Sequence, residues 1–138
     1  MKRQINSQGV YRPNALFSHA MAVDGGTLVC SSGVLARDPE TGRILHPGDV
    51  QQQTMACLGT LDKVLRTAGG SLDSIVKMTV FLRHAQDYDA MNAARRARLA
   101  GCDYASSTII AGLVAEDALV EIEVMAVVPP TATDRVPS

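Results

Sequence analysis

Residues 74–82, Ser-Ile-Val-Lys-Met-Thr-Val-Phe-Leu, are expected to form the central strand of this chain. β-Branched and aromatic side chains dominate it, and its length suits a single strand. One helical pattern precedes it and another follows it, so each helix joins two strands through a crossover connection. This order predicts a single α+β domain in which two helices pack on one face of a mixed sheet.

The segment before this strand carries a helical signal over residues 50–68. Apolar side chains recur there at spacings of three and four residues, at Met55, Leu58, Leu61, Val64 and Leu65. We expect Asp49 to cap the helix, with Gln52 as its capping-box partner, and Gly69-Gly70 to end it.

Strands and turns are expected in the N-terminal third of the chain. Residues 20–23 and 27–30 flank Asp24-Gly25-Gly26, which predicts a β-hairpin because glycine accepts a positive φ. A weaker strand signal covers residues 9–12. The cluster Asp38-Pro39-Glu40-Thr41-Gly42 predicts a second turn.

Beyond the central strand, a second helix is expected from a cap at Asp87 to about Ala100, with Gly101 after its end. Strands are expected over residues 105–114 and 119–128. In the last strand, alternation directs one set of side chains toward the helices: Val120, Ile122, Val124, Ala126 and Val128. The opposite set is Leu119, Glu121, Glu123, Met125 and Val127. An apolar face of this kind predicts contact with another copy of the chain.

The composition argues against several classes of protein. The 138 residues suffice for one domain, and 13 Lys and Arg against 14 Asp and Glu leave a net charge of −1. This balance does not favour a nucleic-acid partner. No apolar run approaches the ~20 residues of a membrane span and no secretory signal is visible, so we expect a cytoplasmic protein without membrane contact. Neither the distant Cys30, Cys57 and Cys102 nor the isolated His46 and His84 predict disulfides or a metal site.

Seven segments, in order along the chain, resemble the RidA/YjgF family of reactive-intermediate (enamine/imine) deaminases. They are Phe17-Ser18-His19-Ala20, Ser31-Ser32-Gly33, Asp38-Pro39-Glu40-Thr41-Gly42, Ala68-Gly69-Gly70-Ser71-Leu72, Val76-Lys77-Met78-Thr79-Val80-Phe81-Leu82, Asn92 and Val120-Glu121-Ile122-Glu123. The resemblance covers residues 14–129 as one domain. Residues 1–13 are then an N-terminal segment, and residues 130–138 are expected to be a disordered tail.

The resemblance implies a chorismate-mutase-like fold that assembles as a homotrimer with small-molecule clefts between subunits. It also implies cofactor-free hydrolysis of 2-imino or 2-enamino acids to 2-keto acids and ammonia. A glutamate of the last strand handles water in such members, and Glu121 matches it. Ser32 and Asn92 match residues that line or support the cleft, and Gly33 is assigned to the substrate site with them. Phe17 stands in place of a usual tyrosine.

The segment Tyr104-Ala105-Ser106-Ser107 departs from the family, because Ser106 stands where an arginine binds the substrate carboxylate. A serine lacks the planar, bidentate and charged grip of a guanidinium. One alternative is that another arginine replaces it, from the set Arg12, Arg43, Arg95, Arg96 and Arg98. Another is that Ser106, Ser107 and Thr108, the last in place of a frequent cysteine, bind a neutral polar ligand. A Ser–His pair across subunits that uses His19 is a third.

Two functions remain. The first is a hydrolase or deaminase acting on an enamine, imine or related small C–N compound that differs from the usual 2-imino acids. The second is a non-catalytic, small-molecule-binding or protein-interacting trimer of the same fold. Relatives described as ribonucleases or translation inhibitors suggest a third role, which the near-neutral charge does not support.

Overall fold

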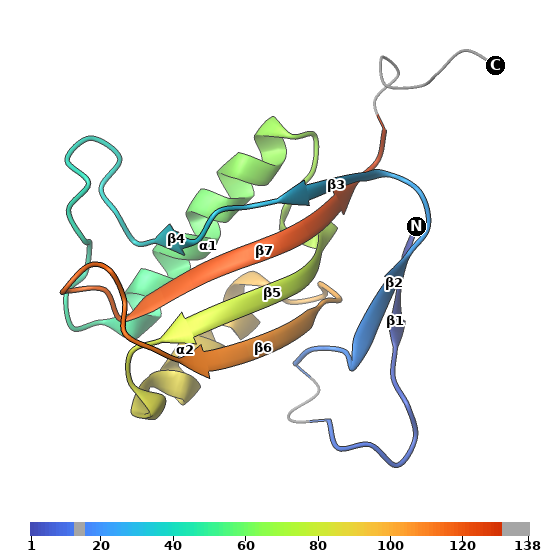
Figure 1. Cartoon of the computed structure of the whole chain (residues 1–138), viewed down its shortest axis with the longest axis horizontal. Coiled ribbons are helices and arrows are strands. Elements are labelled where there is room, and N and C mark those ends of the chain that lie inside the picture. Colours follow the sequence, from blue (N-terminus) through green and yellow to red (C-terminus); the bar gives the residue numbers. More distant parts are fainter. Residues whose placement is uncertain (13–15, 131–138) are drawn as a thin grey trace.

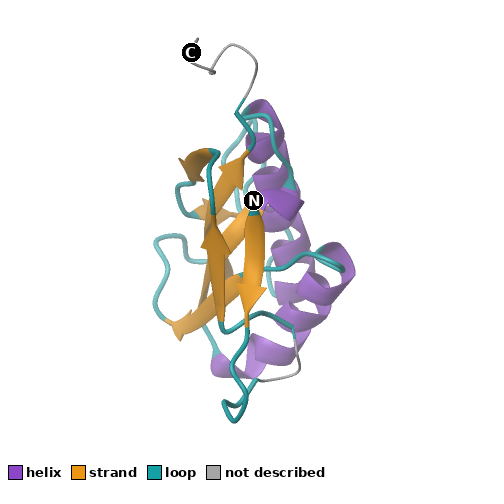
Figure 2. Ribbon diagram, turned by 90° about the vertical axis from the view of Figure 1, so that its right-hand side faces the viewer, coloured by secondary structure: helices purple, strands orange, loops and turns teal. Residues whose placement is uncertain are grey.

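A five-stranded mixed sheet carries two helices on one of its faces in the computed structural model (Figures 1 and 2). The strand order is β3 (Thr27–Cys30), β7 (Val120–Val128), β5 (Ile75–Leu82) and β6 (Ala105–Ile110), and β4 (Val34–Leu35) also pairs with β7. The helices are α1 (Val50–Thr67) and α2 (Tyr88–Arg98). The predicted α+β architecture is therefore confirmed.

The structure describes residues 1–12 and 16–130. All of the predicted disordered tail except Pro130 lies outside the described residues. Within the described residues, neither helix has the length and hydropathy that crossing a membrane requires.

The predicted central strand lies between two partners of opposite direction. β5 runs antiparallel to β7 and parallel to β6, and α2 forms the crossover between the two parallel strands. Phe81 lies opposite Glu121 in one ladder, and Met78 lies opposite Ser106 in the other. This register decides which site residues share a face of the sheet.

The core lies between the helices and the sheet. Asp49 caps α1 as expected, because its side chain accepts a 3.0 Å hydrogen bond from the Gln52 backbone N–H. The apolar side of α1 buries Leu58, Leu61 and Leu65. The predicted alternation of the last strand is confirmed, since five side chains of β7 are buried beneath the helices: Val120, Ile122, Val124, Ala126 and Val128.

The predicted hairpin is wrong, although both of its strands exist. β2 (Ala20–Val23) pairs with β1 (Lys2–Ile5) in a separate two-stranded sheet, and β3 pairs with β7. Gly25 and Gly26 have φ angles of 74° and 86°, and they direct the chain from one sheet to the other. A Cβ at Gly26 would meet the Val128 carbonyl oxygen, so the turn also lies close to β7. Pairing therefore follows the long partner strand and not the short turn.

The strand signal at residues 9–12 is also wrong. The first strand is β1, and residues 9–12 belong to a loop held by His19. The His19 Nδ1 atom accepts a 3.0 Å hydrogen bond from the Ser7 N–H, and the His19 N–H donates to Asn6 Oδ1. These bonds fix the loop without strand pairing.

Three element ends differ from expectation. The Asp87 side chain does not cap α2, because Asp87 has helical dihedrals (φ −84°, ψ 0°) and closes a 3₁₀ turn, η3 (Ala85–Asp87). The helix ends at Arg98, three residues before Gly101. β6 ends at Ile110, where its pairing with β5 ends at Leu82. A second 3₁₀ turn, η2 (Leu72–Ser74), leads into β5.

Candidate functional site

An interruption of the sheet places Ser32 and Gly33 beside the Glu121 carboxylate. β3 and β4 both pair with β7, but residues 31–33 between them leave the ladder. Ser31 satisfies the backbone groups of Val124 at this interruption. Its N–H donates to the Val124 carbonyl and its Oγ accepts from the Val124 N–H, both at 2.9 Å. The backbone of Ser32 and Gly33 is thereby left exposed next to the strand that carries Glu121.

Gly33 lies in direct contact with the Glu121 carboxylate. A Cβ added at Gly33 would overlap Glu121 Oε2 and approach Glu121 Cδ to 2.9 Å. Only a residue without a side chain leaves the carboxylate where it is. Gly33 and Glu121, which were predicted to belong to one site, are therefore in contact.

We expect Gly33→Ala to leave the protein folded and to reduce any activity that depends on Glu121. The backbone of Gly33 is not in the left-handed region, and the overlapping atom is the end of a flexible side chain. The alanine therefore turns the carboxylate away without straining the sheet. Activity assays and thermal unfolding, run side by side, measure the two effects.

Gly59→Ala is the matched control for this prediction. Gly59 lies within α1 and a Cβ there meets nothing within 4 Å. Its replacement should stabilise the helix by about 1 kcal/mol and leave activity unchanged. Full activity in Gly33→Ala would mean that the position of Glu121 does not matter.

Cys57 lies close behind Glu121 but cannot act as a nucleophile at neutral pH. Burial, with a smaller contribution from the Glu121 charge, raises the pKa of Cys57 to about 12. Its Sγ donates to the Val34 carbonyl at 3.4 Å. Thiolate, the reactive form, is therefore absent at neutral pH.

A second group of predicted residues gathers around a single arginine. Arg95 of α2 donates from Nη1 to Ser106 Oγ at 2.7 Å. It also donates to Asn92 Oδ1 from Nε at 3.1 Å and from Nη2 at 2.7 Å. The Phe17 ring lies over the guanidinium, with its centroid 5.7 Å from Arg95 Cζ. Among the candidate arginines, Arg95 is the one that reaches Ser106.

The other candidates lie elsewhere. Arg12 donates from Nε to the Phe17 carbonyl, and Arg98 approaches Asp62 to 3.5 Å. Arg43 and Arg96 are exposed. His19 holds the N-terminal loop through both ring nitrogens, since Nε2 faces the Tyr11 carbonyl at 3.1 Å and Nδ1 already accepts a bond. It therefore has no free nitrogen with which to activate a serine.

The two groups occupy opposite faces of the sheet. Ser106 pairs with the buried Met78 and points toward the helices, whereas Glu121 pairs with Phe81 on the open face. Thr108 shares the helix side with Ser106, because it pairs with the buried Val80. The exposed Ser107 lies on the open face, where its Oγ accepts a 3.0 Å hydrogen bond from Lys77 Nζ. Sequence reasoning treated these residues as one site and missed this division, which strand alternation could have indicated.

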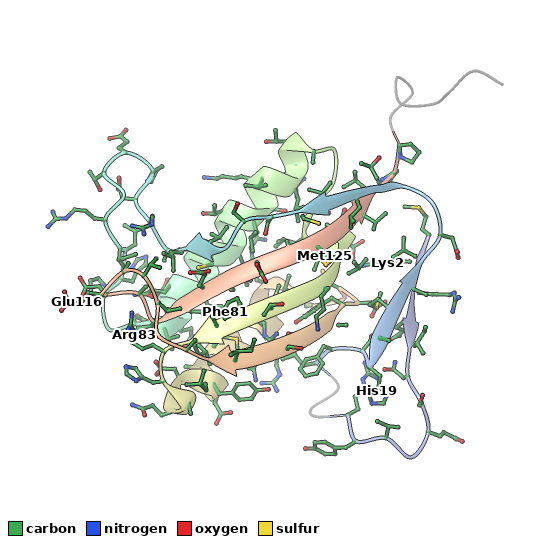
Figure 3. All side chains as sticks on the ribbon, viewed as in Figure 1. Lys2, His19, Phe81, Arg83, Glu116 and Met125 are labelled. Carbon is green, nitrogen blue, oxygen red and sulfur yellow. The ribbon has the colours of Figure 1, made fainter. Side chains whose placement is uncertain are left out.

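The open face mixes apolar side chains with charged ones, and no helix of the described residues covers it (Figure 2). Figure 3 shows Phe81 and Met125 on the side of the sheet turned away from the helices. Leu28 and Met125, neighbours on this face, are 57% and 41% exposed. A hollow of about 230 Å³ on this face is lined in part by Cys30, Lys77, Glu123 and Met125. Within the described residues, no cluster of three or more His, Cys, Asp or Glu is suited to hold a metal ion.

These features define the class of the protein: a single α+β domain whose helix-free sheet face carries a carboxylate against an exposed glycine. The comparison with known families then gives its membership. The family model described as Endoribonuclease L-PSP matches residues 10–128, and the chain belongs to this family, known also as the YjgF/RidA family.

Relatives from distant organisms support this membership. A RutC family protein of Pyrococcus abyssi is 29% identical over 114 residues, which cover 83% of this chain and 89% of that protein. The mitochondrial protein mmf2 of Schizosaccharomyces pombe is 35% identical over 105 residues, which cover 74% of this chain and 80% of that protein. The structure of YyfB from Yersinia pestis, of the conserved Rid protein family, superposes with a TM-score of 0.81 at 26% identity, covering 92% of this chain and 98% of YyfB.

Proposed function

We propose that this protein is a cofactor-free hydrolase that converts an enamine, imine or related small C–N compound to a carbonyl compound and ammonia. The observation that carries the proposal is the Glu121 carboxylate held against the exposed Ser32–Gly33 backbone. A carboxylate in this position can take a proton from water while the backbone contacts the substrate. Family membership makes this reaction class the first to test.

The proposed chemistry balances without an electron carrier. Glu121 removes a proton from water as the oxygen attacks the imine carbon, and the C=N electron pair moves to nitrogen. That nitrogen takes the proton back from the Glu121 carboxyl group, which gives the neutral carbinolamine. Glu121 then transfers the hydroxyl proton of the carbinolamine to the nitrogen, and ammonia leaves as the C–N bond breaks and the C=O bond forms. The sum is imine plus water to carbonyl compound plus ammonia, with no change of oxidation state.

We further propose that the complete cleft forms between copies of the chain, as a cytoplasmic homotrimer. Glu121 and Ser106 lie on opposite faces of one sheet and cannot both touch one small molecule within a single chain. β6 is the edge strand of that sheet, and beyond the Ser18–Ala105 bridge at its start the described residues leave its outer edge available to the open face of a neighbouring copy. The apolar side chains of the open face would be buried by such a contact.

The assembly is tested by Met125→Glu, which we expect to separate the oligomer into monomers. A charged side chain at the centre of an apolar contact costs several kcal/mol unless it is paired. Light scattering coupled to size-exclusion chromatography gives the mass of each species. Val64→Glu, at a position on α1 that is 42% exposed, is the control and should not change the mass. A monomeric wild type, or an intact Met125→Glu oligomer, would contradict the proposed interface.

The reaction is tested by following keto-acid release from 2-imino acids that an amino-acid oxidase generates in situ. An imine without a carboxylate is tested in parallel. We expect the protein to exceed spontaneous hydrolysis on at least one of the two substrates. If the protein accelerates the hydrolysis of neither substrate, the result favours the alternative function, a small-molecule-binding or protein-interacting trimer without turnover. The replacement of the family's arginine by Ser106 is the observation that favours this alternative.

A further inference from the structure

Arg95 carries a fully buried positive charge in the layer between α2 and the sheet. Its exposed fraction is 0%, and burial lowers the pKa of its guanidinium below the usual value. An arginine remains protonated in a protein even so, and a charge removed from water is costly unless it is paired. The hydrogen bonds that hold it come from neutral acceptors, Asn92 Oδ1 and Ser106 Oγ.

No carboxylate of the described residues lies within ion-pair distance of Arg95. The nearest elements offer none, since Asp62 of α1 pairs with Arg66 and Arg98. Residues 13–15, which precede Phe17, are Pro, Asn and Ala and contain no acid. A buried cation without a counter-ion lowers stability, so its presence indicates a purpose other than folding.

A second buried group beside Arg95 also has no partner. Tyr104 is 1% exposed, and its hydroxyl lies near the guanidinium but outside hydrogen-bond geometry, so it bonds to no described residue. Buried hydroxyl groups are nearly always hydrogen-bonded. One guanidinium N–H is also poorly used, since Nη1 donates to Ser106 Oγ at 2.7 Å and its other contact is the thioether of Met78, at 3.9 Å. The Tyr104 O–H and this N–H are donors without a good acceptor.

The neighbours of Arg95 align it while leaving its charge unneutralised. Asn92 Oδ1 accepts from both Nε and Nη2, which fixes the plane of the guanidinium. Ser106, the residue in place of the family's arginine, accepts a hydrogen bond from Nη1 and adds no charge. The partly exposed Phe17 ring stacks on one face of the Arg95 guanidinium.

We propose that Arg95, aligned by Asn92 and Ser106 and assisted by the Tyr104 hydroxyl, binds the carboxylate group of a small-molecule ligand that displaces the Phe17 ring. The helix thus supplies the guanidinium that strand β6 lacks. The ligand class follows from the chemistry, because a planar carboxylate is the anion that a guanidinium fork binds with two parallel hydrogen bonds. That this ligand is the substrate rests on the proposed function, whereas the binding itself does not.

The direct test observes the side-chain Nε–Hε resonance of Arg95 in the ¹⁵N-labelled wild-type protein during titration with pyruvate. Pyruvate should shift this resonance in a saturable manner, whereas sodium chloride at equal ionic strength and methyl pyruvate, which lacks the charge, should not. No shift with pyruvate, or an equal shift with the ester, would overturn the proposal. This measurement uses the wild-type protein, so its result does not depend on whether a variant folds.

Asn92→Asp is the sharpest variant, because it keeps the shape and the accepting oxygen but supplies the missing negative charge. It should fold and bind pyruvate at least about tenfold more weakly, because its own carboxylate then pairs with the guanidinium in place of the ligand. Arg95→Met should lose binding to the same degree. Arg96→Met, at an exposed position on the same helix, is the control. Undiminished binding in Asn92→Asp would overturn the proposal.

The assays separate this proposal from the proposed function. Turnover of imines without pyruvate binding at Arg95 would mean that the hydrolase proposal holds and this one fails. Pyruvate binding at Arg95 without turnover would mean the reverse.

Discussion

Glu121→Gln is expected to lower the rate of imine hydrolysis by about 100- to 10,000-fold, the range typical of losing a general acid or base. Glutamine has the size of glutamate but cannot accept a proton from water. Glu121 forms no salt bridge within the described residues, so its replacement should leave stability nearly unchanged. Steady-state kinetics of keto-acid release, with circular dichroism to verify folding, measures both quantities.

Glu123→Gln is the matched control for this loss. Glu123 lies on the same face of the same strand, two residues further along, opposite Thr79. The three atoms nearest a Cβ at Gly33 all belong to Glu121 and not to Glu123, so most activity should remain. An equal loss in the two variants would mean that the face needs negative charge in general, and wild-type turnover in Glu121→Gln would remove the proposed base.

Leu61→Ala is expected to destabilise the protein by about 2–5 kcal/mol, the largest effect on folding that we predict. Leu61 is 0% exposed and belongs to the core cluster beneath α1. Truncation removes apolar contacts and leaves a cavity that a close-packed interior refills only in part. On a chain of this size, such a loss is a large share of the total stability.

Urea unfolding at one fixed protein concentration measures this loss, since assembly would make the midpoint depend on concentration. Val64→Ala, three residues further along the same helix and 42% exposed, is the control and should cost much less. A small effect of Leu61→Ala with an unchanged m-value would show that the core closes around the missing side chain.

Local patterns predicted most of the elements. The helix over residues 50–68, its Asp49 cap and the alternating burial of β7 depend on neighbours within a few residues, and the structure confirms them. Strand pairing was less predictable. A glycine turn between two strands looks the same whether the strands pair with each other or with distant partners, and here β7 and β1 provide the partners.

The candidate site shows the same division between local and long-range information. The residue types were visible in the sequence: a carboxylate on the last strand, a Ser-Gly pair, an asparagine and several arginines. Their grouping was not. A strand sends successive side chains to opposite faces, so Ser106 and Ser107 separate, and Glu121 lies across the sheet from Ser106.

The family, the two helices, the central strand and the partly apolar open face could all be predicted from the sequence, because periodicity and family-like segments are properties of contiguous residues. Only the tertiary structure decided that Arg95, and not Arg12, Arg43, Arg96 or Arg98, reaches Ser106. It also decided that Gly33 contacts Glu121. Both outcomes depend on the strand register and on how α2 packs on the sheet, which arise from long-range contacts that no local pattern records.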